Sequence, residues 1–62
     1  MFNPYQLIGM EEVAAKKAIS SNNFVWQVIE RDGQFVPHFH SIRLDRISLR
    51  VEDNTIISAF IS

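Results

Sequence analysis

The sequence predicts a small α+β protein in which one helix packs on one face of a short β-sheet. Two observations support this fold class. Only the segment 10–23 combines helical apolar spacing with a helix-like order of charges. Later segments are rich in β-branched and aromatic residues, as strands are: 24–30, 42–52 and 55–62. A chain of 62 residues is expected to form one domain, 1–62.

The composition is that of a folded protein, and it points away from nucleic acids and membranes. Hydrophobic residues make up 47% of the chain and charged residues 21%, which is too apolar for a disordered protein. The net charge of -1 lacks the basic excess that phosphate binding requires, and no apolar run approaches the length of a membrane span. Because there is no cysteine and no visible signal peptide, we expect a cytoplasmic protein, although these features leave secretion open.

The N-terminal part is predicted to contain an extended segment followed by the helix. Residues 1–9 are expected to be extended, because Pro4 disfavours a helical conformation at Asn3. Glu12 lies in the first turn of the helix, where a carboxylate is favourable for the helix dipole. Its partner is expected to be Lys16, four residues further along. The helix face that packs on the sheet is small and apolar, and consists of Ala15, Ala18 and Ile19.

The first strand is followed by a less regular segment. Residues 24–30 are predicted to form the strand, and Asp32-Gly33 predicts a turn after it. Residues 35–41 have an extended pattern, but Pro37 argues against a central strand there. A hairpin across the Asp32-Gly33 turn is an alternative, and it would shorten any exposed segment that follows.

The segment 42–52 is predicted to be the second long strand. Its apolar residues alternate toward the core, and they are Ile47, Leu49 and Val51. The opposite face carries Arg46, Ser48 and Arg50. Asp53-Asn54 then turns the chain into a final strand at 55–62.

The arginine-bearing face of this strand has two interpretations. The alternation pattern favours an ordinary solvated strand face. Alternatively, guanidinium groups from this face hold the irregular segment upstream, Pro37–Arg43, because each presents several hydrogen-bond donors in a fixed geometry.

His38 and His40 are the best candidates for metal ligands, but two ligands are too few. Their spacing directs both side chains to one side of an extended chain. A zinc site needs three or four protein ligands, whereas the chain has no cysteine and no third histidine. We therefore expect no metal and no other cofactor. We also expect no enzyme activity, because no nucleophile–base arrangement is recognisable.

The two stretches Leu7–Ile19 and Ile42–Ile56, taken together, resemble the potato inhibitor I family of serine protease inhibitors. Leu7–Ile19 contains an aliphatic pair and a glycine, followed by a helix with Ala-Lys-Lys, as in that family. Ile42–Ile56 opens with Ile-Arg-Leu-Asp-Arg-Ile, which is similar to the family's aromatic-Arg-aliphatic-Asp-Arg-aliphatic run at the start of a long strand. The resemblance covers most of the chain.

The resemblance implies a single helix packed on a small mixed β-sheet with a long exposed binding loop. In the family, this loop enters the active site of subtilisin-like or chymotrypsin-like enzymes as a substrate would, and arginines from the following strand hold it. The corresponding reactive loop here consists of Pro37, His38, Phe39, His40, Ser41, Ile42 and Arg43. The resemblance implies that Arg46 supports the loop. The family's second supporting arginine is replaced by Ser48 here, so this second half of the support is either missing or supplied by Arg50.

The resemblance leaves the register of the loop open. Counting from Arg-x-Asp-Arg makes His40 the specificity residue, with the scissile bond between His40 and Ser41. The loop is slightly longer than in the family, so Phe39 is the alternative.

The expected function is therefore inhibition of a serine protease, which would be the protein partner. The alternative is a non-inhibitory protein–protein interaction module on the same fold, of microbial or viral origin or self-associating through uncovered strands. We expect a monomer or a weak homo-oligomer.

Overall fold

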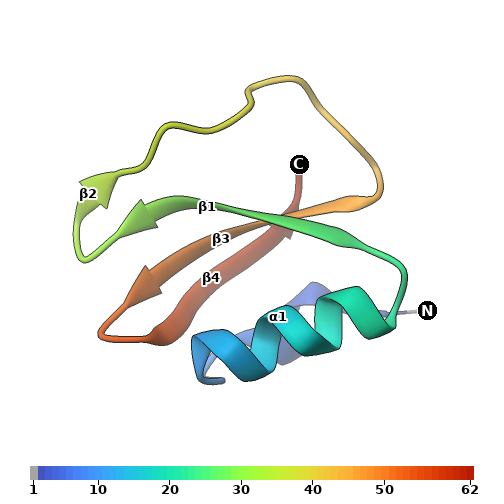
Figure 1. Cartoon of the computed structure of the whole chain (residues 1–62), viewed down its shortest axis with the longest axis horizontal. Helices are drawn as coiled ribbons and strands as arrows, with labels where there is room; N and C mark the ends of the chain where they lie inside the picture. The colour runs from blue at the N-terminus through green and yellow to red at the C-terminus, as the bar shows by residue number, and fades with distance from the viewer. Residues whose placement is uncertain (1) are drawn as a thin grey trace.

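The computed structural model describes residues 2–62, which form one helix packed on a mixed four-stranded sheet (Figure 1). The elements in chain order are the 3-10 helix η1 (Pro4–Leu7), α1 (Glu12–Ser21), β1 (Val25–Arg31), β2 (Gln34–Phe35), β3 (Arg46–Glu52) and β4 (Thr55–Ile61). The strand order is β2-β1-β3-β4; β1 and β3 are parallel, and the two outer pairs are antiparallel. The small α+β architecture predicted from the sequence is confirmed.

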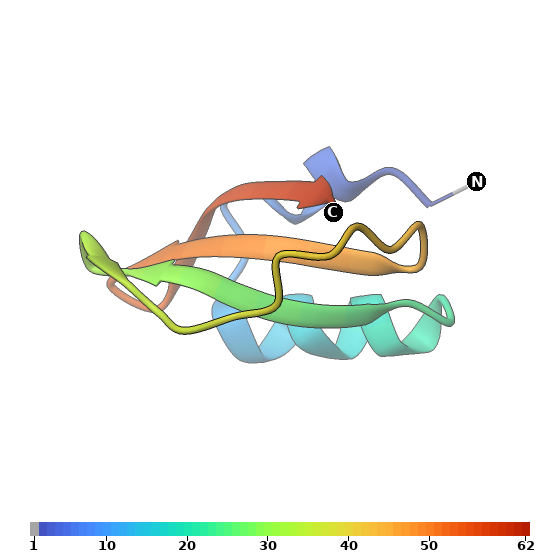
Figure 2. The same cartoon turned by 90° about the horizontal axis from the view of Figure 1, so that it is seen from above.

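The two faces of the sheet are covered differently. Helix α1 lies along one face, whereas the segment 36–45, which connects β2 to β3, passes over the other (Figures 1 and 2). Because β1 and β3 are parallel neighbours, the chain has to return from the end of β1 to the start of β3. The segment 36–45 makes most of that return.

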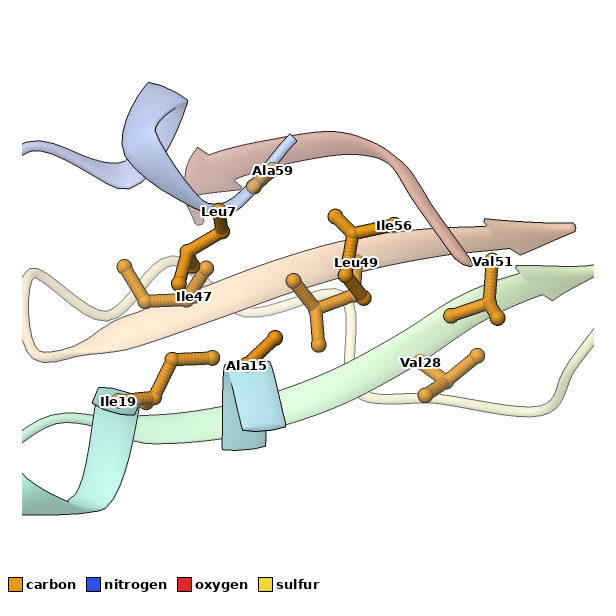
Figure 3. Packing of buried hydrophobic residues seen from close by; sticks show 9 residues of the cluster. All are labelled: Leu7, Ala15, Ile19, Val28, Ile47, Leu49, Val51, Ile56 and Ala59. Carbon is orange, nitrogen blue, oxygen red and sulfur yellow. The ribbon is translucent and has the colours of Figure 1, made fainter. Parts of the chain in front are cut away.

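The core lies between the sheet and the two helices (Figure 3). Its buried residues are aliphatic: Leu7, Ala15, Ile19, Val28, Ile47, Leu49, Val51, Ile56 and Ala59. The predicted alternation of β3 toward the core is confirmed. Ala15 has no exposed surface, and its small side chain lets the helix backbone approach the sheet closely.

The prediction of an extended segment at 1–9 is wrong for residues 4–7, which form η1, and Met1 lies outside the described residues. Asn3 caps this helix: its backbone is extended, and its Oδ1 accepts a hydrogen bond from the Tyr5 N–H at 3.0 Å. Pro4 favours this conformation at Asn3, and it also suits the first helical position, where no N–H is needed. The proline therefore starts a short helix instead of a strand.

Helix α1 is shorter than the predicted 10–23. Glu11 is its N-cap residue, but the Glu11 side chain makes no capping hydrogen bond. Instead, the Glu12 N–H donates to the Asn54 carbonyl at 2.8 Å. The turn between β3 and β4 thus satisfies one of the N–H groups that a helix start leaves unpaired.

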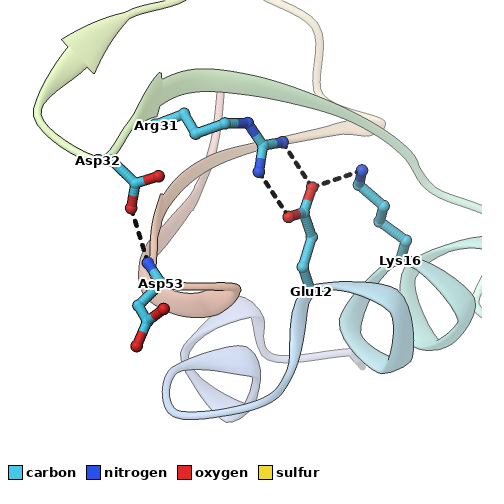
Figure 4. A network of polar contacts seen from close by, with 5 residues as sticks. All are labelled: Glu12, Lys16, Arg31, Asp32 and Asp53. Carbon is cyan, nitrogen blue, oxygen red and sulfur yellow. Dashed lines mark hydrogen bonds and ion pairs between the residues drawn. The ribbon is translucent and has the colours of Figure 1, made fainter.

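Charged side chains join the start of α1 to the end of β1 (Figure 4). The Glu12 carboxylate accepts two hydrogen bonds from the Arg31 guanidinium, each 2.7 Å long, and Lys16 Nζ also lies 2.7 Å from it. These contacts, chiefly that with Arg31, lower the pKa of Glu12 to about 2. The expected Glu12–Lys16 pair is present, but it belongs to a three-residue cluster.

The hairpin alternative is confirmed in a short form. The two residues of β2 pair with Glu30 and Arg31. At the turn, Asp32 and Gly33 have φ values of 50° and 80°, the positive values that tight hairpins require. Pro37, which has no N–H to donate, follows soon after β2.

The second long strand begins later than predicted, at Arg46 instead of Ile42. Its ladder with β1 starts at the pair Val25–Arg46, so the preceding residues extend past the start of β1. Ile42 and Leu44 alternate as strand residues do, yet they are 80% and 82% exposed. Alternation alone could not show where the neighbouring strand starts.

Candidate protein-binding loop

The segment Val36–Asp45, called the binding loop below, lacks regular secondary structure. It includes all seven residues of the predicted reactive loop, Pro37–Arg43. Its backbone runs over the face of β1 and β3 that points away from α1 (Figure 2). Side chains from that face position the loop.

Arg46 anchors the C-terminal half of the binding loop. It is only 4% exposed, and its guanidinium donates to two main-chain oxygens. Nη2 donates to the Ser41 carbonyl, and Nε donates to the main-chain oxygen of Ser62 at 2.9 Å. The strand-face arginine therefore reaches the loop, and the favoured interpretation of a solvated face is wrong for Arg46.

Gln27 anchors the middle of the loop from β1. Its Nε2 donates to the Phe39 carbonyl at 3.2 Å, and its Oε1 accepts from the Phe39 N–H at 3.1 Å. Nε2 also donates to Ser48 Oγ at 3.0 Å. Sequence reasoning missed Gln27. The available signal was a polar side chain in the middle of the apolar stretch Phe24–Ile29, on the strand face opposite Val28.

Ser48 and Arg50 have different roles from the ones weighed from the sequence. Ser48 is fully buried beneath the loop, where its hydroxyl accepts from Gln27. Arg50 pairs with Glu30 on β1 at 3.3 Å instead of with the loop. The expectation that Arg50 supplies the missing half of the support is therefore wrong. The second anchor comes from the neighbouring strand.

The two histidines lie side by side on the loop. Their ring centroids are 4.6 Å apart, and His38 Nδ1 is 2.6 Å from the Val36 carbonyl oxygen. Nδ1 therefore carries the proton and donates to that carbonyl. Among residues 2–62, no group of three or more His, Cys, Asp or Glu side chains is arranged to hold a metal ion.

An ion pair between Arg43 and Asp45 lies at the C-terminal end of the binding loop. The Arg43 guanidinium donates to both carboxylate oxygens of Asp45, at 2.8 and 2.7 Å. This contact holds the pKa of Asp45 below its usual range and raises that of Arg43. Because both side chains are about half exposed, the pair orders the chain locally and contributes little to stability.

The loop and its approach display large apolar side chains to solvent. Phe35, Phe39, Ile42 and Leu44 are 82%, 73%, 80% and 82% exposed. The Arg46 guanidinium carbon lies 5.9 Å from the Phe39 ring centroid, close enough for a weak cation–π contact. Exposed apolar side chains gathered on one segment are typical of a protein-binding surface.

Comparison with known proteins does not place the chain in a family. No protein-family model matches it, and neither the curated proteins nor the solved structures contain a significant match. The helices among residues 2–62 do not include one with the length and apolar character needed to cross a bilayer.

Proposed function

We propose that the protein is a serine protease inhibitor that presents Pro37–Arg43 to a subtilisin-like or chymotrypsin-like enzyme, in the manner of the potato inhibitor I family. One observation carries this proposal. The exposed binding loop is anchored through its backbone at two points, to Gln27 at Phe39 and to Arg46 at Ser41.

Backbone anchoring is the property that separates an inhibitor loop from a good substrate. A flexible substrate loses conformational entropy when a protease orders it, whereas a loop held in place beforehand loses little. Side chains such as Phe39 and Ile42 remain free to contact the enzyme, because the anchors use main-chain groups. If the loop is cut, the anchors on either side keep the new ends close together, which favours resealing over release.

A second candidate function is a protein-binding module without inhibitory activity. It is favoured by the spread of exposed apolar side chains beyond the centre of the loop. Phe35, Ile42 and Leu44 are each at least 80% exposed, which makes a surface broader than the entrance of a single specificity pocket.

Titration against four proteases distinguishes these two functions. The native protein is mixed with subtilisin, chymotrypsin, trypsin or elastase, and the residual activity is measured. We expect submicromolar inhibition of subtilisin or chymotrypsin, on the scale of a standard protein–protein interface. Absence of inhibition of all four enzymes at about 50 µM, with an unchanged circular dichroism spectrum, would exclude the inhibitor and leave the binding module.

Loop variants link the inhibition to the proposed contact. Phe39→Asp and His40→Asp place a carboxylate where an apolar or aromatic contact is expected, so each should weaken inhibition by at least about 30-fold. Glu52→Asn, at the exposed far end of β3, is the control and should leave inhibition unchanged. If Phe39→Asp and His40→Asp inhibited as strongly as Glu52→Asn, the loop would not be the contact.

A further inference from the structure

Gln27 holds Phe39 as a neighbouring strand would. Its side-chain amide both donates to and accepts from the main chain of this one residue, at 3.2 and 3.1 Å. The same pair of bonds joins two directly opposite residues in an antiparallel ladder. The N–H and the carbonyl of Phe39 therefore both face the sheet.

The residue that follows faces the other way. In an extended chain, successive residues direct their side chains and their backbone polar groups to alternating sides. The pair of bonds from Gln27 to both main-chain groups of Phe39 fits an extended backbone at this residue, and the 4.6 Å between the rings of His38 and His40 fits residues two apart that share a side. Positive φ values among residues 2–62 fall outside the binding loop. The N–H and carbonyl of His40 therefore point away from the sheet.

Ser41 is anchored on the other side of His40. Its carbonyl accepts a hydrogen bond from Arg46, which is buried beneath the loop. The carbonyl of His40 thus lies between two carbonyls that the protein itself holds inward. His40 is also exposed, so a partner can reach both its side chain and its main chain.

We infer that Gln27 is a positioning residue that sets the register of the loop, so that His40 and not Phe39 enters the primary pocket of the target protease. This inference rests on the proposed inhibitory function. A protease needs the carbonyl of the specificity residue in its oxyanion hole and the adjacent main chain for strand-like pairing. Phe39 could supply these groups only by giving up both bonds to Gln27, whereas the groups of His40 are already turned outward.

An imidazole at the specificity position also indicates the class of partner. The target is an endopeptidase that accepts a polar aromatic ring, the imidazole of His40, in its primary pocket. Phe39 then occupies the neighbouring subsite on the N-terminal side. A broad pocket suits this ring better than a deep slot built for a long cationic side chain, so the unaltered protein is expected to inhibit trypsin poorly.

Two lysine variants test the register directly. Trypsin binds a lysine in its primary pocket through a buried carboxylate, so lysine at the specificity position should create a trypsin inhibitor. We expect His40→Lys to inhibit trypsin about 100-fold more strongly than the native protein, and Phe39→Lys to show no comparable gain. Both positions are exposed, so neither substitution disturbs the core.

Each other outcome of this test is informative. A gain by Phe39→Lys alone would overturn the register while leaving the inhibitor intact. The same conclusion would follow if neither variant gained but the native protein inhibited another of the four enzymes. If the native protein and both variants inhibit none of the four enzymes, the proposed inhibitory function is wrong, and the proposed register of the loop is wrong as well.

The role of Gln27 is tested by Gln27→Met, which keeps the length of the side chain but removes both bonds to Phe39. We expect the Phe39 amide to exchange hydrogen about tenfold faster, a readout that needs no protease. We also expect faster cleavage of the loop by the inhibited enzyme, with cuts beyond the His40–Ser41 bond visible by mass spectrometry.

Arg50→Met is the matched control for Gln27→Met. It removes a pairing with Glu30 on the same face of the sheet, outside the loop. This variant should keep slow Phe39 exchange and a single cleavage site. Native-like exchange and cleavage in Gln27→Met would overturn the positioning role.

Discussion

Arg46 is a charged residue that is almost fully buried, and its environment explains why. A buried guanidinium needs partners for its donors. It donates to the main-chain oxygens of Ser41 and Ser62, and the Ser62 N–H in turn donates to the Arg46 carbonyl at 3.0 Å. This one side chain therefore joins the binding loop, β3 and the last residue of the chain.

Arg46→Lys is expected to affect inhibition more than stability. Lysine keeps the charge, but its single ammonium group cannot reproduce the planar fork that spans two carbonyls. We expect the free energy of unfolding to fall by about 1 kcal/mol and inhibition to weaken about tenfold or more. Urea unfolding and the inhibition constant give the two values.

Val28→Ala provides the comparison for Arg46→Lys. Val28 is buried on the opposite face of the sheet, against α1, and its truncation should cost about 1 to 2 kcal/mol without touching the loop. If this variant lost as much inhibition as Arg46→Lys, the effect of Arg46 would be one of general stability.

Among the elements, α1 depends on the sheet for its first turn. Its N-cap residue, Glu11, makes no side-chain capping bond. The Glu12 N–H is satisfied from outside, by the Asn54 carbonyl, and the carboxylate of Glu12 binds Arg31 at the end of β1. Helix position and sheet register are thereby coupled.

The Glu12 cluster predicts an acid-sensitive contribution to stability. The pKa of Glu12 is about 2 in the folded protein, against an ordinary value of 4.5, so the folded state favours the ionised carboxylate. The stabilisation is therefore complete above about pH 4.5 and is lost as the pH falls toward 2. Arg31 is 41% exposed, so we expect about 2 kcal/mol after solvent screening, less than the full shift implies.

Glu12→Gln measures this contribution. At pH 7 the free energy of unfolding of the variant should be about 2 kcal/mol lower than that of the native protein. This difference should shrink toward zero near pH 2. Glu11→Gln is the matched control, because Glu11 is the adjacent, exposed carboxylate without a capping bond. A pH-independent difference for Glu12→Gln would contradict the ion-pair explanation.

Across the sheet as a whole, β2 and β4 are poor templates for another strand, whereas the N-terminal part of β1 lies at an edge that the short β2 does not cover. The edge strand β2 contains only Gln34 and Phe35. At the other edge, β4 is partly covered by the segment before α1, which exchanges backbone hydrogen bonds with Ile56. The Gly9 N–H donates to the Ile56 carbonyl at 2.8 Å, and the Ile56 N–H donates to the Met10 carbonyl at 2.9 Å. Short and covered edges reduce edge-to-edge pairing.

Because only the N-terminal part of β1 is left at an uncovered edge, we expect a monomer in solution. Sedimentation equilibrium should give the mass of one chain up to about 100 µM, since an association that depends on concentration would appear in this range. A concentration-dependent dimer that is abolished by Phe60→Lys, on the exposed part of β4, would instead support self-association through this edge.

Much of the fold follows from local sequence patterns, whereas the ends of its elements do not. The spacing of Ala15 and Ile19 and the alternation of Ile47, Leu49 and Val51 predicted the faces that are buried. The start of β3 was misplaced, because Ile42 and Leu44 are spaced two apart as strand residues are, although they have the parity of Arg46 and not that of Ile47, and the ladder with β1 begins only at Arg46. An element boundary depends on where its neighbour begins, and that information is not local.

Local sequence patterns were enough to predict the α+β class, the turn at Asp32-Gly33 and the apolar face of β3, because periodicity and turn chemistry act over a few neighbouring residues. Tertiary structure alone decided what holds the binding loop. Gln27 lies twelve positions from Phe39 and reaches it across the face of the sheet, while Arg50, a better candidate by pattern, turns to Glu30. Hydrogen-bond partners of this kind are selected by strand order and register, which bring distant residues together only after the chain has folded.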